Sequence, residues 1–226
     1  MRPLSLCWGR LSLTLGALGL AAAWCIGLVY LRWRLTDSPQ YLFLAWNLLL
    51  AAIPLGFALW LSRIRRRSVG LAVLAGWLLF FPNAPYVITD FIHLSPSRHT
   101  LLWFDVLLLA SFAVVALWLG LVSLHLVHEW VAARFSVAAG WFAAIAACPL
   151  AGFGVYLGRY GRWNSWDALW RPAALLADVA TLVTTPAAAR AGGITLGFAG
   201  FLLVTYVVWR AHGGSCSVPS DAAARR

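Results

Sequence analysis

The chain has 226 residues, of which 62% are hydrophobic and only 11% are charged. Soluble globular domains are about 45–50% apolar and about 25% charged. This composition excludes an ordinary soluble domain, a disordered chain and a small secreted domain held together by disulfides. It predicts an all-α, polytopic membrane protein whose main partner is the lipid bilayer.

The 17 basic residues, all of them arginine, dominate a formal net charge of +10. They lie at the ends of apolar runs or in short loops, which is the distribution that membrane proteins show. A nucleic-acid-binding surface would instead gather them on one polar face, so no nucleic-acid partner is predicted. The lack of lysine beside abundant alanine, glycine and tryptophan is typical of a GC-rich bacterial genome.

Several apolar runs are long enough to cross a membrane, since a transmembrane helix needs about 20 apolar residues. They predict a helix bundle of about six transmembrane helices, with spans at 11–31, 41–61, 68–92, 101–124, 135–157 and 193–209. These spans form a single transmembrane domain over residues 1–212. The remaining residues, 213–226, are predicted to be a disordered cytoplasmic tail.

The arginine distribution predicts the orientation of these helices. The densest cluster connects the second and third spans and consists of Arg63, Arg65, Arg66 and Arg67. We expect it in the cytoplasm, because cytoplasmic loops are enriched in Lys and Arg. With an even number of spans, both termini then lie in the cytoplasm. The predicted location is the bacterial cytoplasmic (inner) membrane, as a multi-pass protein with N-in and C-in topology.

The connection between the fifth and sixth spans is the long one. Its segment 172–187 begins with Pro172, which is favourable at the first helical position. Five aliphatic side chains of this segment share one helical face: Leu175, Leu176, Val179, Leu182 and Val183. The pattern predicts one external amphipathic helix on the outer membrane surface, with a buried re-entrant segment as the alternative.

The third span contains two prolines, Pro82 and Pro85. Each removes a backbone donor and clashes with the preceding turn, so we expect the helix to break near Asn83. Irregular backbone at membrane depth needs protein groups or a water-filled cavity to satisfy it. Asn83 can supply such hydrogen bonds, and a helix can resume at about Tyr86.

Asp90 and His93 follow this break three residues apart, so a helix places them on one face. A carboxylate beside an imidazole can orient a general base or form part of a metal site. Asp105, at the external start of the fourth span, is brought close by a short loop. We therefore predict Asp90, His93 and Asp105 as catalytic residues, with a divalent metal as a candidate cofactor. For Asp105, the alternative is a favourable interaction with the helix dipole.

A further polar cluster follows the fifth span. Arg159 and Arg162 are three residues apart, as are Tyr160, Trp163 and Trp166, and a helical turn would give them a cationic edge beside an aromatic edge. Guanidinium groups suit carboxylate or phosphate ligands. The predicted substrate-binding residues, including those near the break, are Asn83, Tyr86, Arg159, Arg162, Trp163, Asn164 and Asp167.

A purely structural role is the alternative for this cluster. Arg159 and Arg162 would then be ion-pair partners of Asp90, Asp105 or Asp167. The tryptophans would form a belt at the membrane interface.

At the predicted cytoplasmic end of the fourth span, His125, His128 and Glu129 are spaced i, i+3 and i+4. The spacing resembles a metal-ligand face, but the order differs from the H-E-x-x-H of zinc proteases, and no fourth ligand is evident. We expect a solvated helix end here rather than a metal site.

The run F-P-N-A-P-Y-V-I-T-D-F-I-H-L at residues 81–94, with W-F-D at 103–105 and the cluster at 158–167, resembles a known family. It is similar to the bacterial membrane proteins grouped as domain-of-unknown-function family 1361. The resemblance extends roughly from the second to the sixth span. It implies a multi-span bacterial integral membrane protein and supplies no substrate.

Three classes of function are consistent with these features. The first is an enzyme with an externally facing site that acts on a lipid-linked or headgroup substrate, because polar groups from three segments converge on one predicted face. The second is a small transporter or transporter subunit, since half-helices often build substrate sites. The third is a membrane assembly or accessory protein with structural ion pairs only. We favour the enzyme, with a lipid-linked or anionic substrate as its partner, and the sequence indicates no particular protein partner.

Overall fold

The computed structural model describes residues 4–94 and 101–212, and side chains from residue 11 onward. The described residues form helices and no strands, which confirms the all-α prediction. The elements are α1 (Leu4–Thr36), α2 (Phe43–Arg63), α3 (Arg67–Phe80), α4 (Asn83–Tyr86), the 3₁₀ helix η1 (Val87–His93), α5 (Leu102–Arg134), α6 (Val137–Tyr160), α7 (Asp167–Trp170), α8 (Pro172–Val183) and α9 (Ala187–Ala211). The predicted tail at 213–226 lies outside the described residues.

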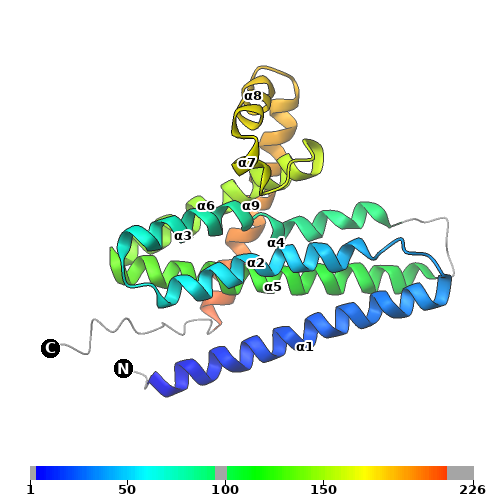
Figure 1. Cartoon of the computed structure of the whole chain (residues 1–226), viewed down its shortest axis with the longest axis horizontal. Helices are drawn as coiled ribbons and strands as arrows, with labels where there is room; N and C mark the ends of the chain where they lie inside the picture. Colours follow the sequence, from blue (N-terminus) through cyan, green and yellow to red (C-terminus); the bar gives the residue numbers. More distant parts are fainter. Residues whose placement is uncertain (1–3, 95–100, 213–226) are drawn as a thin grey trace.

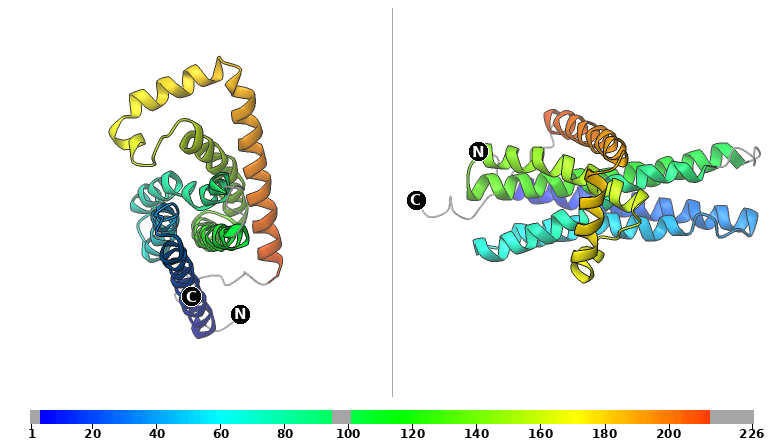
Figure 2. Two further views of the ribbon diagram at one scale, coloured as in Figure 1. Left: turned by 90° about the vertical axis from the view of Figure 1, so that its right-hand side faces the viewer. Right: turned by 90° about the horizontal axis from the view of Figure 1, so that it is seen from above.

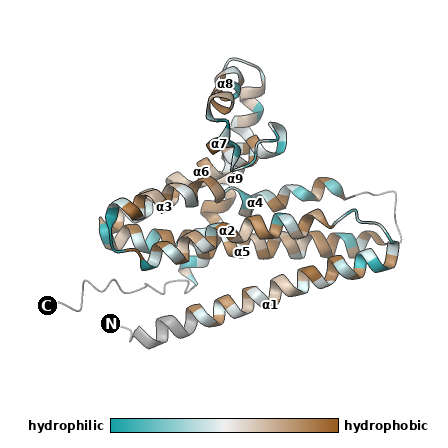
Figure 3. Cartoon of the chain, viewed as in Figure 1, coloured by the Kyte–Doolittle hydropathy of each residue, from teal (hydrophilic) through white to brown (hydrophobic). Residues whose placement is uncertain are grey.

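Six helical segments in this part of the chain are long and apolar enough to cross a membrane. They are Leu11–Thr36, Phe43–Arg63, Arg67–His93, Leu102–Arg134, Val137–Tyr160 and Ala187–Ala211. Hydrophobic residues extend along the helices, and hydrophilic residues gather mainly near their ends and turns (Figure 3). Large exposed apolar surface is rare on soluble proteins and is expected against lipid. The chain is therefore a multi-pass membrane protein with a polytopic helix bundle.

Helix α5 lies at the centre of this bundle, packed against α2 and α6, with α1 at the edge (Figure 1). These helices and α3 extend along the long axis of the molecule. Helix α9 has a different direction, because it runs across the others and packs mainly on α6 (Figures 1 and 2). Helices α7 and α8 stand out from the bundle beside the beginning of α9.

Glycine allows the neighbours of α6 to approach it closely. A Cβ atom at Gly152 would lie 2.5 Å from the backbone oxygen of Thr195 on α9, and one at Gly154 would overlap the ring of Pro82. Small residues bring membrane helices together because van der Waals packing, rather than the hydrophobic effect, drives their association in lipid. The positions of α9 and of the broken third span both depend on these glycines.

The third span breaks where the prolines predict it. Helix α3 ends at Phe80, and α4 and η1 follow after a two-residue turn. The amide of Ala84 donates to Phe81 O rather than continuing the α-helical pattern to Phe80 O. Asn83 Nδ2 donates to Phe80 O at 2.9 Å instead, so this side chain satisfies a carbonyl that the break leaves without its helical donor.

Three predicted boundaries are wrong. The span predicted at 101–124 continues to Arg134, because the polar residues that end the apolar run are buried against α9. The surface helix predicted at 172–187 ends at Val183, and α9 begins at Ala187 instead of residue 193. A proline disfavours helical backbone in the residue before it, so Pro186 separates α8 from α9.

Candidate functional site

Asp90 of η1 is buried, with 1% of its surface exposed, and is bound from two other elements. Its Oδ2 accepts a hydrogen bond of 2.7 Å from Asn47 Nδ2 on α2. Its Oδ1 lies 2.5 Å from Nη2 of Arg159 at the end of α6. A buried carboxylate needs such partners, because an unpaired charge at membrane depth is strongly unfavourable. Asp90 therefore ties α2, η1 and α6 together.

Arg159 directs its guanidinium group toward η1 and α4. Its Nε donates to Thr89 Oγ1 at 2.9 Å, and its Cζ lies 4.6 Å from the centre of the Tyr86 ring, within the range of a cation–π interaction. For Arg159, the ion-pair alternative is the one that the structure shows. An anionic ligand would have to compete with Asp90 for this charge.

Asp105, in the first turn of α5, forms a separate ion pair. Arg32 near the end of α1 places Nε 2.5 Å from Oδ1 and Nη2 3.1 Å from Oδ2, a two-pronged geometry typical of strong arginine–carboxylate pairs. Tyr41 Oη lies 3.2 Å from Oδ2. The alternative that paired Asp105 with Arg159 or Arg162 is therefore wrong, because α1 supplies its partner.

His93 joins neither carboxylate. Its side chain is exposed, and its ring packs against Phe43 with 4.8 Å between ring centres. Among the described residues, no hydrogen bond links His93 to Asp90, and no three His, Cys, Asp or Glu side chains form a group that could hold a metal ion. The predicted catalytic and metal-binding set of Asp90, His93 and Asp105 is thus not assembled into one site.

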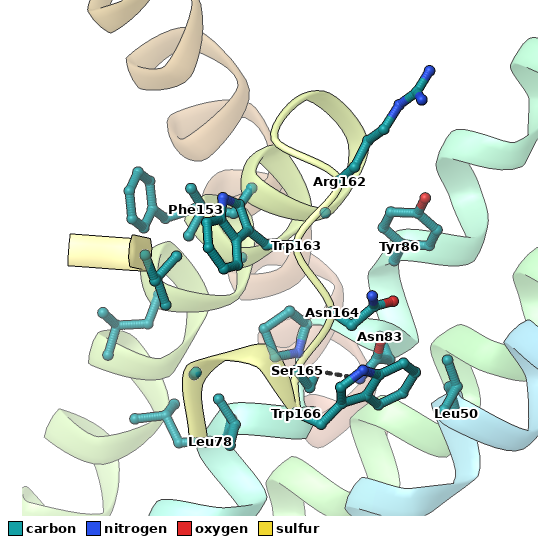
Figure 4. A pocket seen from close by; sticks show the side chains of 18 of the residues that line it. Leu50, Leu78, Asn83, Tyr86, Phe153, Arg162, Trp163, Asn164, Ser165 and Trp166 are labelled. Carbon is teal, nitrogen blue, oxygen red and sulfur yellow. Dashed lines mark hydrogen bonds between the residues drawn. The ribbon is translucent and has the colours of Figure 1, made fainter. Parts of the chain in front are cut away.

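A cavity of about 610 Å³ lies beside the Asp90–Arg159 pair, between α2, α3, α4 and α6 and next to the loop 161–166 (Figure 4). Its volume is in the range of small-molecule sites. Its polar lining consists of Asn47, Asn83, Tyr86, Arg162, Asn164 and Ser165. Its large apolar and aromatic lining consists of Trp46, Leu50, Leu78, Leu79, Pro82, Leu150, Phe153, Leu157, Trp163, Trp166 and Leu175.

Most of the predicted substrate-binding residues line this cavity, namely Asn83, Tyr86, Arg162, Trp163 and Asn164. The other two hold the lining in place, Arg159 through Asp90 and Asp167 through the loop. Asp167 Oδ2 accepts from the backbone N and Nδ2 of Asn164 at 2.8 and 3.1 Å. Asn83 Nδ2 donates to Ser165 Oγ at 2.9 Å. The structure thus brings the cluster after the helix break and the cluster after α6 together.

The residues after α6 do not continue as the predicted helical turn. Helix α6 ends at Tyr160, and Arg162 in the following loop has a positive φ of 57°, which is uncommon outside glycine. The Arg162 side chain is exposed and extends away from the cavity (Figure 4). It therefore forms no shared cationic edge with Arg159. Trp163 Nε1 donates to Asp178 Oδ2 at 3.0 Å, which anchors the loop to α8.

Sequence reasoning missed Asn47, Arg32 and Tyr41, which complete the two ion-pair networks. Two of them carried a signal, because Asn47 is an amide within an apolar run and Arg32 is a charge at the end of one. Polar groups at membrane depth are usually paired and functional. The identity of each partner depends on helix packing, which this signal does not contain.

The histidines in the last third of α5 are buried, which corrects the prediction of a solvated helix end. His125 and His128 are 5% and 1% exposed. Arg210 Nη1 of α9 lies 2.8 Å from Glu129 Oε1 and 3.2 Å from His125 Nδ1, and Tyr206 Oη lies 3.1 Å from His128 Nδ1. This cluster fastens α9 to α5, and the described residues of the cluster form no metal-binding group.

The fold and the site together define a class of protein: an all-helical, multi-pass membrane protein whose broken third span borders a cavity. The sequence profile of the family described as "Protein of unknown function (DUF1361)" matches residues 46–205. The chain belongs to this family, as the resemblance in its motifs predicts. The matched region contains the whole cavity lining and the Asp90–Arg159 pair, whereas Arg32 and Tyr41 precede it. The comparisons with curated proteins and with solved structures gave no match.

Proposed function

We propose that this protein binds a membrane amphiphile, either a lipid or a lipid-linked molecule, in the cavity beside the Asp90–Arg159 pair. The observation that carries this proposal is the composition of the lining. Polar side chains gather where α2, α4 and the loop 161–166 meet, and apolar side chains line the walls from α3 and α6. An amphiphile has matching chemistry, with a headgroup that forms hydrogen bonds and a chain that prefers apolar surroundings.

The cavity also adjoins the surface that faces lipid in this proposal. Trp46 on α2 and Leu150 on α6 both line the cavity, and they are 55% and 49% exposed. Such exposed apolar side chains are expected against hydrocarbon. The chain of a bound amphiphile can therefore pass from the cavity into the bilayer along apolar surface, a route that a small water-soluble ligand would not use.

In this proposal the Asp90–Arg159 pair has a positioning role. Asn47 and Tyr86 line the cavity, and each contacts one member of the pair. The pair itself does not belong to the lining. Its task is to hold α2, α4 and α6 at the spacing that keeps the cavity open.

A tryptophan introduced into the cavity tests the proposal. Ala75 on α3 lines the cavity, whereas Ala72, one turn earlier and also exposed, does not. Lipids that co-purify with each variant in mild detergent are extracted, identified and quantified by mass spectrometry. We expect wild type and Ala72→Trp to retain a defined lipid and Ala75→Trp to lose most of it. Equal retention by the two variants would contradict the proposal.

Catalysis on the bound amphiphile is a second candidate function, favoured by the hydrogen bond that links Asp90 to the cavity-lining Asn47. A proton-transfer group must lie within hydrogen-bond reach of its substrate, directly or through one water molecule, and Asn47 places Asp90 one side chain away from the cavity. The test incubates the purified protein with its retained lipid. A product formed by wild type and absent with Asp90→Asn/Arg159→Gln would support catalysis, and an unchanged lipid with wild type would contradict it.

We further propose that the protein lies in the bacterial inner membrane with both termini in the cytoplasm. The arginine cluster from Arg63 to Arg67 supports this orientation through the positive-inside rule. The turns α2–α3 and α5–α6 lie at the same end of the bundle (Figure 1), as alternating spans require.

A further inference from the structure

The orientation of each asparagine amide in the cavity is fixed by its partners. Asn47 Nδ2 donates to Asp90 Oδ2 at 2.7 Å, and Asn164 Nδ2 donates to Asp167 Oδ2 at 3.1 Å. Asn83 Nδ2 donates to Phe80 O at 2.9 Å. Carboxylate and carbonyl oxygens accept hydrogen bonds and cannot donate them. Each amide therefore turns its nitrogen toward a protein acceptor, and its oxygen remains available to accept a hydrogen bond from a ligand.

The polar lining consequently presents amide oxygens as acceptors beside several donors. Among the described residues, no hydrogen bond ends on Oδ1 of Asn47, Asn83 or Asn164. Asn83 uses both of its N–H groups, since Nδ2 also donates to Ser165 Oγ at 2.9 Å. The remaining donors of the lining are the second N–H of Asn47 and of Asn164, the hydroxyls of Ser165 and Tyr86, the indole N–H groups of Trp46 and Trp166, and the Arg162 guanidinium group. A ligand here meets both acceptors and donors, which suits groups that donate and accept.

The two arginines near the cavity do not converge to form a phosphate-binding site. Arg159 is held by Asp90 and Thr89, and Arg162 extends away from the cavity (Figure 4). A phosphate accepts hydrogen bonds only, so it would leave the amide oxygens of Asn47, Asn83 and Asn164 without a donor. An ammonium group could donate to the amide oxygens, but the described lining contains no carboxylate to balance its charge. A hydroxyl group donates and accepts, and it carries no charge.

Aromatic side chains supply the other half of the recognition. The indole groups of Trp46, Trp163 and Trp166 line the same cavity. In Figure 4 the Trp166 ring is drawn beside Asn83, whereas the Trp163 ring lies toward Phe153. The flat apolar faces of such rings offer a large contact area beside polar groups. A sugar ring has this dual character, since its C–H faces are apolar and its edge carries hydroxyls.

We infer that the headgroup bound here is a neutral, hydroxyl-rich glycosyl group, so that the ligand is a glycolipid rather than a lipid ending in a phosphate. This inference rests on the proposed function, because it names the class of amphiphile that the cavity accepts. It keeps the lipid-linked substrate expected from the sequence and replaces the anionic alternative. The amide oxygens of Asn47, Asn83 and Asn164 accept from the sugar hydroxyls, and Ser165 donates to one of them.

The test compares lipids with matched acyl chains and different headgroups. The purified full chain, in a polyoxyethylene detergent that lacks sugar, is mixed with glucosyl diacylglycerol, phosphatidic acid or phosphatidylethanolamine. Native mass spectrometry counts the bound lipid, and thermal unfolding measures the stabilisation that binding causes. We expect glucosyl diacylglycerol to bind about tenfold more tightly than either phospholipid, as unpaired polar groups in a site penalise the wrong ligand.

Matched variants locate the binding. Trp166→Ala removes a lining ring, whereas Trp170→Ala removes an exposed ring four residues later that is not part of the lining. We expect Trp166→Ala to weaken glucosyl diacylglycerol binding and Trp170→Ala to leave it unchanged. Equal or stronger binding of phosphatidic acid or phosphatidylethanolamine, abolished by Ala75→Trp, would overturn the glycosyl inference and leave the proposed function standing. If Ala75→Trp changes the binding of none of these lipids, both fail.

Discussion

Asp90 and Asp105 are buried, and each is matched by one arginine from a helix distant in the sequence. Burying an ion pair costs the hydration of both groups, so such pairs contribute little net stability. Removing a single partner is far more harmful, because a charge is then left buried without compensation. The two pairs act mainly by fixing which helices meet.

Arg159→Gln is expected to destabilise the protein by about 3 kcal/mol, since Asp90 would keep only Asn47 as a strong partner. Adding Asp90→Asn to the same chain is expected to restore much of the loss, because no unpaired charge remains. The measurement is thermal unfolding in detergent, with the exposed Arg162→Gln as the matched control. An unchanged Tm for Arg159→Gln would show that the pair does not hold the fold.

The Arg32–Asp105 pair allows two substitutions with losses of stability of different size to be compared. Asp105→Leu leaves Arg32, which is 2% exposed, without its carboxylate, and we expect a loss of about 3–5 kcal/mol. Tyr41→Phe removes one hydroxyl near Asp105, and we expect a loss of about 1 kcal/mol. Trp103→Ala, at a position that is 82% exposed on the same helix turn, is the control. The reverse order of Tm values for Asp105→Leu and Tyr41→Phe would contradict this account.

At the scale of single residues, the sequence identifies many of the side chains that form the ion pairs and the cavity lining. It does not identify which residue each of them contacts. Asp90, Asn83 and Tyr86 were predictable because ionisable or polar groups beside two prolines stand out in an apolar chain. The partner of Asp105 was not, since Arg32 is 73 positions away. A contact of that kind is a consequence of how α1 packs on α5, and residue types alone do not encode it.

Helix α6 shows how small residues decide the packing of whole elements. Gly152 faces the backbone of Thr195, and Gly154 faces Pro82 at the break of the third span. Side chains at these positions would push α9 and the broken span away from α6. Helix α6 contributes Phe153 and Gly154 to one wall of the cavity. Moving the broken span away from α6 would therefore change the shape of the cavity.

Gly152→Ala and Gly197→Ala are expected to change stability in opposite directions. The new methyl group at Gly152 collides with backbone that cannot move aside, which typically costs about 1–3 kcal/mol. At Gly197 nothing lies within 4 Å of the new Cβ atom. Alanine loses less backbone freedom than glycine when the chain folds, so this substitution is expected to stabilise α9 by about 0.5–1 kcal/mol. Thermal unfolding of both variants checks the signs. A Gly152→Ala protein as stable as Gly197→Ala would contradict the close contact.

At the scale of elements, hydropathy predicts the existence of the helices better than their ends. The apolar runs correspond to the six long helical segments found among the described residues, and two prolines were enough to place the break near Asn83. The extension of α5 to Arg134 was missed because buried polar residues such as His128 interrupt the apolar pattern without interrupting the helix. The loop after Tyr160 was missed because its spacing of arginines and tryptophans imitates a helical face.

The whole molecule contains two features that no local pattern predicts. One is the direction of α9, which is apolar like the other spans but runs across them (Figure 2). The other is the cavity, which exists because the loop 161–166 and α8 lie beside α3, α4 and α6. Both arise from contacts between distant segments, including Trp163 with Asp178 and Arg210 with Glu129. The candidate site therefore became visible only when these segments were placed together.

The proposed orientation is testable with single cysteines in a chain whose native cysteines are replaced by serine or alanine. Ser38 lies between α1 and α2, and the exposed Ser68 lies in the first turn of α3, near the arginine cluster. In spheroplasts, a membrane-impermeant maleimide is expected to label Ser38→Cys, and to label Ser68→Cys only after lysis. The opposite pattern would reverse the orientation.

A C-terminal reporter tests α9 separately, because its direction differs from that of the bundle. Cytoplasmic activity of this reporter is expected if α9 completes the sixth crossing, and external activity would contradict it.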